Sequence, residues 1–349
     1  MKQIALRGKM FAKRKIAKAL GYHPDRSISL ERREKPCHVS NEKIETYSDS
    51  SATEIYDPRS ESLQGHYFQQ RNAYLVKNVI IEPKQGLVYS CTGELIEEST
   101  NWPIFQFYNS FPWNPKKNIT HLHLESAIFL PSSAFWHWLI EDLPLAIFTL
   151  GINSSSPLLV ARNPPKYVSD FLETLDREII FLDGPVQVNS LIFVEKSQDA
   201  GWPHPKDLEV VVNYGPFVQA KQLTPALKRI YISRRASRRS PKNEVEIEEF
   251  FQSHNFEIMH LEEFDLVDEI RMMSGVSFIA GVHGAGLANL IWMPRESKIL
   301  DIANENYWTE SVHRAASLRQ VDYNFLLYKG AFDDTVSLEK LEITLSEIY

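Results

Sequence analysis

Residues 276–294, VSFIAGVHGAGLANLIWMP, carry the clearest structural signal in this chain of 349 residues. They predict a buried strand over Val276–Val282, a glycine-rich turn over Gly281–Gly286, and a helix over Leu287–Trp292 that ends before Pro294. Glycine at such a junction lets backbone N–H groups approach an anion at the helix N-terminus. The turn therefore predicts a phosphate site, and the alternative is a tight turn with His283 in the core. Its spacing, GxxGxG, fits neither the dinucleotide motif nor the P-loop.

Strands and helices alternate on both sides of this turn, which predicts a doubly wound parallel sheet. Asn243 and Glu246 form a capping box for a helix with the apolar face Val245, Ile247, Phe250 and Phe251. The remaining expected elements are strands Arg229–Ser233, Phe256–Leu261 and Lys298–Ile302 and helices Asp265–Met273 and Glu310–Leu318.

The preceding part of the chain predicts a second sheet of the same kind. A helix capped by Ser132 or Ser133 is expected to kink or restart at Pro144. The other expected elements are strand Tyr74–Ile81, a hairpin over Gly86–Glu97, strands Pro157–Ala161, Ile179–Leu182 and Ser190–Val194, an alternating segment Ile119–Leu130, and helix Pro165–Leu175. Residues 198–222, rich in proline, are the expected seam between the two sheets.

We therefore expect an α/β chain with two Rossmann-like domains. The expected boundaries are a basic segment with an irregular lead-in over residues 1–65, a first domain over 66–210 and a second domain over 211–349.

Charge is unevenly distributed along the chain. The 38 Lys and Arg against 45 Asp and Glu give a net charge of −7, which disfavours a nucleic-acid partner. Residues 1–20 carry seven bases and no acid, in a weakly amphipathic pattern. This segment is either an attachment to an anionic membrane surface or a solvated terminus. Two cysteines without metal spacing, and no continuous apolar stretch near the N-terminus, predict a cytoplasmic protein. Residues 1–20 would place it at the inner membrane face.

A second group of chemistry-bearing residues follows the strand Arg229–Ser233. Ser233, Arg234 and Arg235 come at its end, and Arg238 and Arg239 follow closely. Since ligands bind at the carboxyl ends of the strands in doubly wound sheets, these guanidinium groups and the glycine turn would meet one diphosphate. A solvated basic loop or a nucleic-acid patch is the alternative.

A third group lies in the first half, in the motif HWLIEDLP at residues 137–144. His137 and Glu141 share one helix face, whereas Asp142 lies about 140° around the helix from His137 and would need a bend near Pro144 to approach it. Histidine is a suitable general base for a hydroxyl, oriented by a carboxylate. A structural histidine is the alternative. Because the chain lacks the DxD, HExxH and GxSxG motifs, we expect no metal and no cofactor.

Taken in their order along the chain, these three groups resemble the family 61 glycosyltransferases. The matching pieces are His137-Trp138 with Asp142-Leu143-Pro144, then Ile232-Ser233-Arg234-Arg235, then Gly281 to Leu290 with Met293-Pro294. The resemblance covers roughly residues 120–330, and residues 1–65 match nothing. The chain looks more like the soluble bacterial members, which make capsules and exopolysaccharides, than like the membrane-anchored eukaryotic ones.

The resemblance implies a GT-B fold, in which two Rossmann-like domains face each other across a cleft, and an inverting mechanism with a nucleoside-diphosphate sugar, expected to be a UDP-sugar, as donor. It implies that a base, His137, Asp142 or Glu141, deprotonates a glycan or glycolipid acceptor. The expected donor-binding residues are Ser233, Arg234, Arg235, His283, Gly284, Ala285, Gly286, Leu287, Asn289 and Glu305, with Asp301 and Asn306 as further ribose candidates. The implied role is capsule, exopolysaccharide or lipopolysaccharide synthesis. A non-catalytic nucleotide- or glycan-binding module and a nucleic-acid-binding protein are the rival hypotheses.

Overall fold

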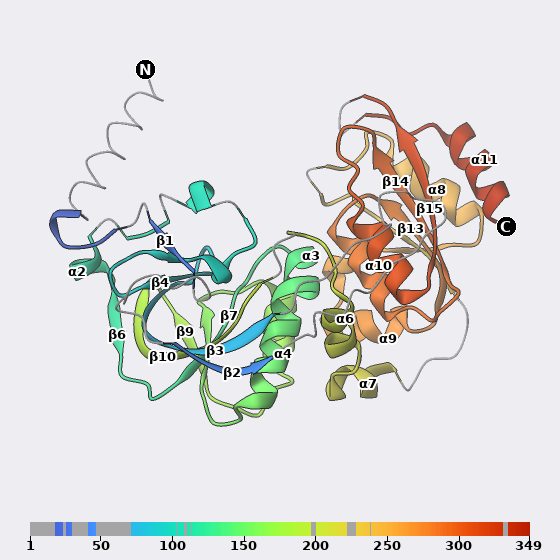
Figure 1. Cartoon of the computed structure of the whole chain (residues 1–349). Coiled ribbons are helices and arrows are strands. Elements are labelled where there is room, and N and C mark those ends of the chain that lie inside the picture. Colours follow the sequence, from blue (N-terminus) through green and yellow to red (C-terminus); the bar gives the residue numbers. More distant parts are fainter. Residues whose placement is uncertain are drawn as a thin grey trace, which may run out of the picture. The chain divides into compact units, whose positions relative to one another are not determined.

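The structure is a computed structural model of the whole chain (Figure 1). It describes residues 18–23, 26–29, 41–46, 71–102, 104–107, 110–112, 114–196, 200–221, 228–237, 239–330 and 334–349. Most of the basic segment 1–20 and its lead-in lie outside the described residues, so the membrane hypothesis stays a prediction. The described residues form two compact units. Unit 1 holds those among 1–52, 67–133 and 141–200, and unit 2 holds 134–140 and those from 201 to 349.

Unit 1 is built on a mixed sheet. Its strands are β1 (Ser27–Ile28), β2 (Asn41–Thr46), β3 (Asn72–Glu82), β4 (Leu87–Ser90), β5 (Leu95–Ile96), β6 (Thr120–Leu122), β7 (Ala127–Leu130), β8 (Leu158–Ala161), β9 (Ile179–Leu182) and β10 (Val186–Val194). The main path runs β1-β5-β4-β3-β10-β7-β8-β9, with β2 beside β3 and β6 beside β10. Strands β10, β7, β8 and β9 are parallel, but β3 pairs antiparallel with β2, β4 and β10.

The expectation of an all-parallel first sheet is therefore wrong, although the strands themselves and the hairpin are confirmed. The physical reason is the short connection between β3 and β4, which covers only residues 83–86. Such a connection joins antiparallel neighbours, because a parallel pair needs a crossover of a dozen residues or more.

The helical segments of unit 1 lie between these strands. They are η2 (Glu97–Ser99), η3 (Ile104–Phe107), α2 (Pro115–Asn118), α4 (Leu143–Ile152) and α5 (Lys166–Leu172). The expected restart at Pro144 is confirmed, since α4 begins at Leu143 with the proline in its first turn. The chain reaches α4 through a π-helical turn, η4 (Trp138–Asp142), which follows α3 (Phe135–His137). Trp138, Leu139 and Ile140 are fully buried there in succession.

Unit 2 contains a wholly parallel sheet in the order β12-β11-β13-β14-β15. Its strands are β11 (Lys228–Ile232), β12 (Glu257–Met259), β13 (Val276–Val282), β14 (Lys298–Asn304) and β15 (Asp322–Tyr328). Its helices, besides α3, are α6 (Pro205–Val212), α7 (Gly215–Lys221), α8 (Glu244–Ser253), η5 (Leu261–Glu263), α9 (Leu266–Met273), η6 (Ala285–Trp292), α10 (Ser311–Arg319) and α11 (Leu338–Ile348). The predicted doubly wound sheet is confirmed for this half.

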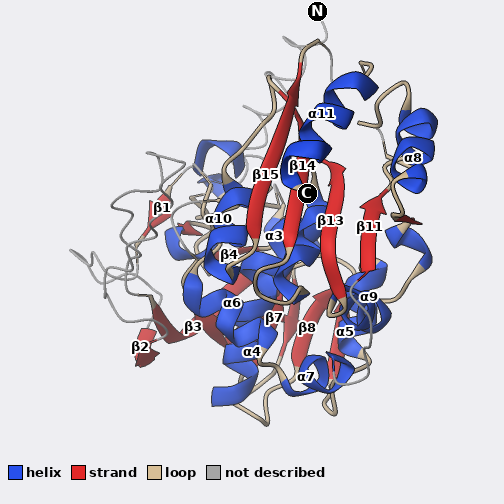
Figure 2. Cartoon of the chain, turned by 90° about the vertical axis from the view of Figure 1, so that its right-hand side faces the viewer, coloured by secondary structure: helices blue, strands red, loops and turns tan. Residues whose placement is uncertain are grey.

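Helices cover both faces of this sheet (Figures 1 and 2). On one face, Phe251 of α8 and Leu345 of α11 pack against Tyr231, Phe278 and other strand residues in one apolar cluster. On the other face α10 contacts β15, with His313 stacked on Tyr323 at 4.5 Å between ring centroids. Burying both faces explains why the strands read as nearly continuous apolar runs.

Some local expectations fail because tertiary partners compete for the same groups. Asn243 does not cap α8, because its side chain is bonded in both directions to the backbone of Val336. Val245 is half exposed and therefore not part of the apolar face of that helix. Ser133 does not cap the helix after it, since its hydroxyl donates to Asp142 at 2.6 Å. The proline-rich segment 198–222 contains α6 and α7.

Candidate functional site

The strand order of unit 2 places a topological switch point between β11 and β13. From β11 the chain runs outward to β12 on one side, and then returns to β13 on the other side and continues to β14 and β15. Ligands of open α/β sheets bind outside the carboxyl ends of the strands at such a point. The residues that follow β11 and β13 are Ser233-Arg234 and His283-Gly284, so both predicted motifs meet at this point.

A pocket of about 300 Å³ opens there, which we call the switch-point pocket. Its lining residues are Ile232, Ser233, Arg234, Ala236, Ser237, Leu261, Glu262, Val282, Gly284, Ala285, Gly286 and Leu287. Six of the predicted binding residues are therefore brought together, namely Ser233, Arg234, Gly284, Ala285, Gly286 and Leu287. Ser237 and Glu262 were not predicted, although both follow the carboxyl ends of strands and that rule could have found them.

The glycine turn presents unused backbone donors to this pocket. The N–H of His283 donates to the carbonyl of Ile302, and that of Leu287 to the carbonyl of Gly284. Within the described residues, the N–H groups of Gly284, Ala285 and Gly286 donate no hydrogen bond. The predicted helix follows as a 3₁₀-helix, η6, and these amides stand at its N-terminus. Three such amides at a helix N-terminus are the donors an anion requires.

Gly284 and Gly286, two of the three glycines of the turn, permit a close approach by another element. A Cβ built on Gly284 would clash with Nη1 of Arg234 and lie 2.9 Å from its Cζ. A Cβ on Gly286 would lie 2.9 Å from Cδ1 of Leu261. Any other residue at these two positions would therefore push Arg234 or Leu261 away from the amides.

Arg234 is fixed beside the amides by bonds from both its ends. Its backbone N–H donates to Glu244 at 2.6 Å, Nη1 donates to the carbonyl of His283, and Nη2 donates to Ser237 at 2.8 Å. Burial lowers the pKa of its guanidinium, and the nearby charge of Arg239 lowers it further. A buried cation whose pKa is lowered by a neighbouring positive charge is stabilised when an anion binds beside it.

Arg235 behaves differently from its neighbour. Its guanidinium pairs with Glu248, its side chain is 54% exposed, and it does not line the pocket. Glu248 also accepts the hydroxyl of Ser233 at 2.6 Å. The two arginines that look equivalent in the sequence therefore occupy separate environments.

His283 is held by a buried carboxylate. Its Nδ1 lies 2.9 Å from Oδ2 of Asp301, which is fully buried and also accepts the hydroxyl of Tyr323 at 2.9 Å. A carboxylate only accepts hydrogen bonds, so Nδ1 carries the proton and Nε2 is turned towards Thr309, 3.4 Å away. Burial raises the pKa of Tyr323, as does the Asp301 charge.

Four predicted binding residues do not line the pocket: Arg235 and His283, described above, and Asn289 and Glu305. Asn289 is fully buried, and its amide donates to Glu269 at 3.0 Å, which ties the glycine segment to α9. Glu305 is exposed after β14 and its N–H donates to Tyr328.

His137 belongs to unit 2, the unit that contains the switch-point pocket. Its ring packs near Gly201, because a Cβ built there would lie 3.4 Å from Cε1 of His137 and 3.6 Å from the hydroxyl of Ser311. Trp136 holds this loop by donating its indole N–H to the carbonyl of Gly201 at 2.8 Å. Ser311 begins α10, two residues after Thr309.

Asp142 lies in unit 1 and is buried within a group of partly buried polar residues that we call the Asp142 cluster: Ser133, Asp142, Tyr167 and Lys196. The carboxylate is 2% exposed and lies 2.6 Å from Nζ of Lys196 and 2.6 Å from the Ser133 hydroxyl. Burial by itself lowers the pKa of Lys196, but the charges of Asp142 and Glu141 outweigh it and raise that pKa. Burial and the Asp142 charge raise the pKa of Tyr167 to about 12.

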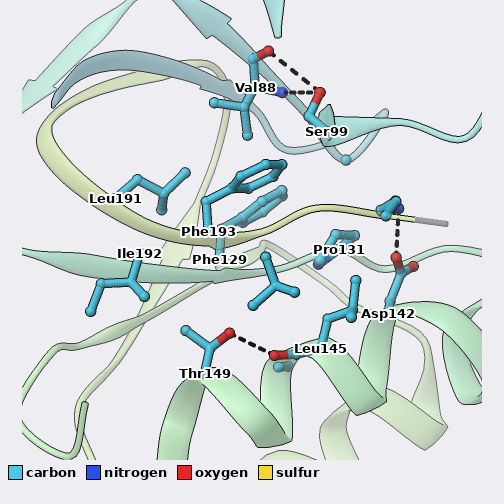
Figure 3. A pocket seen from close by; sticks show the side chains of 14 residues that line it. Val88, Ser99, Phe129, Pro131, Asp142, Leu145, Thr149, Leu191, Ile192 and Phe193 are labelled. Carbon is cyan, nitrogen blue, oxygen red and sulfur yellow. Dashed lines mark hydrogen bonds and ion pairs between the residues drawn. The ribbon is translucent and has the colours of Figure 1, made fainter. Parts of the chain in front are cut away.

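Asp142 and Lys196 lie beside a narrow, mostly apolar cavity of about 40 Å³ between the sheet and α4 (Figure 3). Phe129, Phe193 and Leu145 line it. The adjacent Glu141 is 6% exposed and accepts the amide of Asn101 at 2.5 Å. Lys196 follows the end of β10 and was not predicted; its place beside the end of the parallel neighbour β7 follows from the sheet order alone.

Residues 135–300 match the protein-family model of glycosyltransferase 61. This region is that of a family 61 glycosyltransferase. The match begins in α3 and ends in β14, so it includes His137, the Asp142 cluster except Ser133, and the whole switch-point pocket. No curated protein gives a significant match to the chain.

The described residues contain neither a metal-binding cluster nor a membrane-spanning helix. No group of three or more His, Cys, Asp or Glu side chains is placed to hold a metal ion there. Among the same residues, no helix has both the length and the apolar character to cross a membrane.

Proposed function

We propose that this chain is an inverting glycosyltransferase that transfers a sugar from a nucleoside-diphosphate donor, most simply a UDP-sugar, to a hydroxyl of a glycan or glycolipid. The observation that carries the proposal is the set of three unused amides, Gly284 to Gly286, beside the Arg234 guanidinium in one pocket. The family of the region supports sugar transfer, and this pocket supports an anionic leaving group.

The pocket supplies positive charge where the reaction develops negative charge. When the bond between the anomeric carbon and the donor phosphate breaks, its electron pair stays on the nucleoside diphosphate. The amides of residues 284–286 and the Arg234 guanidinium would bind those oxygens, and they are held in place before the reaction. A fixed guanidinium and fixed amides perform this task without a metal ion, and we propose a metal-free reaction with no cofactor.

We propose His137 as the general base, in preference to Asp142 and Glu141. Asp142 is buried and its oxygens already bind an ammonium group and a hydroxyl, and Glu141 is buried against an amide. His137 is only partly buried and belongs to the unit that holds the donor pocket. It would take the proton of the acceptor hydroxyl as the new bond from that oxygen to the anomeric carbon forms.

His283 acts in this proposal through its backbone and its orientation. Its carbonyl accepts from Arg234, and its ring is locked by Asp301, so the pair sets the position of the guanidinium relative to the amides. Asp301 is therefore proposed as a positioning residue rather than a ribose ligand. We keep Glu305 and Arg235 as donor contacts of lower rank, since neither lines the pocket.

The wider setting of the enzyme is likewise a proposal that rests on the family. We propose a GT-B arrangement of two Rossmann-like domains, with the acceptor held mainly by the first, and a role in bacterial capsule, exopolysaccharide or lipopolysaccharide synthesis. A cytoplasmic protein attached to the inner membrane face through residues 1–20 would meet acceptors carried on lipids.

The decisive experiment compares the two neighbouring arginines. Calorimetry with UDP, GDP and their sugars should show binding that falls about 100-fold or more in Arg234→Ala, because that guanidinium faces the ligand. In Arg235→Ala, the matched control, the affinity for these nucleotides should fall by less than about fivefold. The bound nucleotide sugar should then be turned over in the presence of a glycan acceptor, and His137→Ala should abolish turnover while keeping donor affinity.

Three results would count against the proposal. If the two arginine substitutions weakened donor binding equally, the switch-point pocket would not be the donor site. Donor binding without any transfer or hydrolysis would favour a non-catalytic nucleotide-binding module. Steeply salt-dependent binding of oligonucleotides in place of nucleotide sugars would favour a nucleic-acid protein that uses the arginine cluster.

A further inference from the structure

Glu262 is a carboxylate that lines the switch-point pocket and has no assigned role. It lies in η5, directly after β12, which is the neighbour of β11 at the switch point. The adjacent Glu263 has the same charge and is also exposed, but it does not line the pocket.

The position of Glu262 relative to the amides is set by packing. The preceding residue, Leu261, lies against the glycine turn, where a Cβ on Gly286 would come within 2.9 Å of its Cδ1. Two backbone bonds close the η5 turn, from Glu263 to His260 at 3.1 Å and from Phe264 to Leu261 at 3.2 Å. Gly286 therefore allows the acidic turn to dock directly against the anion site.

The carboxylate has no partner of its own. Within the described part of the chain, Glu262 makes no hydrogen bond and no ion pair, and it is exposed to solvent. An ionised carboxylate can only accept hydrogen bonds, and it repels phosphate oxygens. A ligand that binds the amides with its phosphates therefore binds more tightly if it directs an uncharged hydrogen-bond donor towards Glu262.

We propose that Glu262 accepts hydrogen bonds from the ribose hydroxyls of the nucleoside diphosphate, so that the pocket selects ribonucleotides over deoxyribonucleotides. In a nucleoside diphosphate the sugar with these hydroxyls is joined directly to the phosphates, which makes it the nearest uncharged donor. In other doubly wound sheets, an acidic side chain at the end of a neighbouring strand accepts a hydrogen bond from a ribose hydroxyl. This inference rests on the proposed function, because it takes the donor to be a nucleoside diphosphate.

The test measures the affinity of the full chain for four kinds of probe by calorimetry: UDP and GDP, their 2′-deoxy forms, their 3′-deoxy forms, and inorganic pyrophosphate. The wild type should bind the ribonucleotides about tenfold or more tightly than at least one deoxy form, as expected for a hydrogen bond to a charged acceptor. In Glu262→Ala this ratio should fall to about one, whereas pyrophosphate should bind as well as before or better. Glu263→Ala should keep the wild-type ratio.

Both substitutions are at exposed positions, and unchanged melting temperatures would show that the variants fold. A ratio retained in Glu262→Ala, or lost equally in Glu263→Ala, would overturn the ribose role while nucleotide binding that depends on Arg234 would leave the proposed function standing. If neither pyrophosphate nor any nucleotide binds the wild type, both the ribose role and the proposed function are wrong.

Discussion

The switch-point pocket of unit 2 and the Asp142 cluster of unit 1 both follow the carboxyl ends of parallel strands, yet their polar groups are in opposite states. In the pocket, three backbone amides have no partner among the described residues, and the Arg234 guanidinium is held beside them. In the cluster, the carboxylate of Asp142 is buried and already bound to an ammonium group and a hydroxyl.

This difference indicates that the amides of the switch-point pocket bind a ligand, whereas the Asp142 cluster stabilises the fold. Unsatisfied donors at a helix N-terminus are stabilised when an anion arrives. A buried carboxylate with both partners in place gains nothing from a substrate, and losing it leaves the buried lysine without its counter-charge. Damage to the pocket should therefore change binding, and damage to the cluster should change stability.

The largest effect is expected for Asp142→Asn. Because Lys196 would stay buried without its counter-charge, we expect the free energy of unfolding to fall by about 3–5 kcal/mol. Urea denaturation measures this loss, and adding Lys196→Met should recover much of it. A loss below about 1 kcal/mol, together with a large fall in turnover, would return Asp142 to the role of base.

Gly284→Ala should change donor affinity more than stability, the reverse of Asp142→Asn. Its Cβ would displace the Arg234 guanidinium from its hydrogen bonds, so we expect donor affinity to fall about tenfold. We expect a smaller change in stability, since the displaced group is the end of a long side chain and no backbone has to move. Calorimetry and a thermal melt measure the two quantities. Gly215→Ala is the matched control, as a Cβ there would meet nothing within 4 Å. Unchanged donor affinity in Gly284→Ala would contradict the contact.

Tyr323→Phe should have a smaller effect. The substitution removes the hydroxyl that donates to Asp301 and accepts the indole N–H of Trp308 at 3.0 Å. A loss of about 1–2 kcal/mol in unfolding free energy is expected, because Asp301 stays bonded to His283. Donor affinity should change only slightly, because Tyr323 does not line the switch-point pocket, and a fall as large as that for Gly284→Ala would contradict this purely structural role.

The smallest expected effect is a difference in pKa between two lysines, which their different neighbours cause. Burial, with the charge of Arg319, lowers the pKa of Lys221 to about 8, whereas the carboxylates around Lys196 raise its pKa. Since the folded pKa of Lys221 is below its unfolded value of 10.5, the cost of burying its charge is fully present below pH 8, declines as the pH rises above that value, and disappears near pH 10.5. Amine labelling followed by mass spectrometry should show a midpoint near pH 8 for Lys221. Arg319→Gln should raise this midpoint, and no movement would contradict the assigned cause.

Much of the fold followed from local patterns. Most strands of both units, the hairpin and the helices α8, α9 and α10 were predicted, because apolar runs and turn residues act within a few positions of one another. Strands β1, β2 and β15 and helices α6, α7 and α11 were not predicted. The capping of α8 by Asn243 was not, because Val336, more than 90 residues away, takes its side chain. The all-parallel first sheet also failed, because the pairing of β3 with β10 depends on residues far apart in the chain.

The anion site followed from sequence for the same local reason. A glycine turn after one strand and Ser233-Arg234 after another are both short-range signals, and the rule for strand ends brings them together. Which arginine faces the pocket, whether a carboxylate is free or paired, and the position of Glu262 beside the amides were decided by the tertiary structure. Each depends on partners from distant segments, Glu248, Lys196 and Gly286 respectively, and such partners cannot be read from the spacing of the residues themselves.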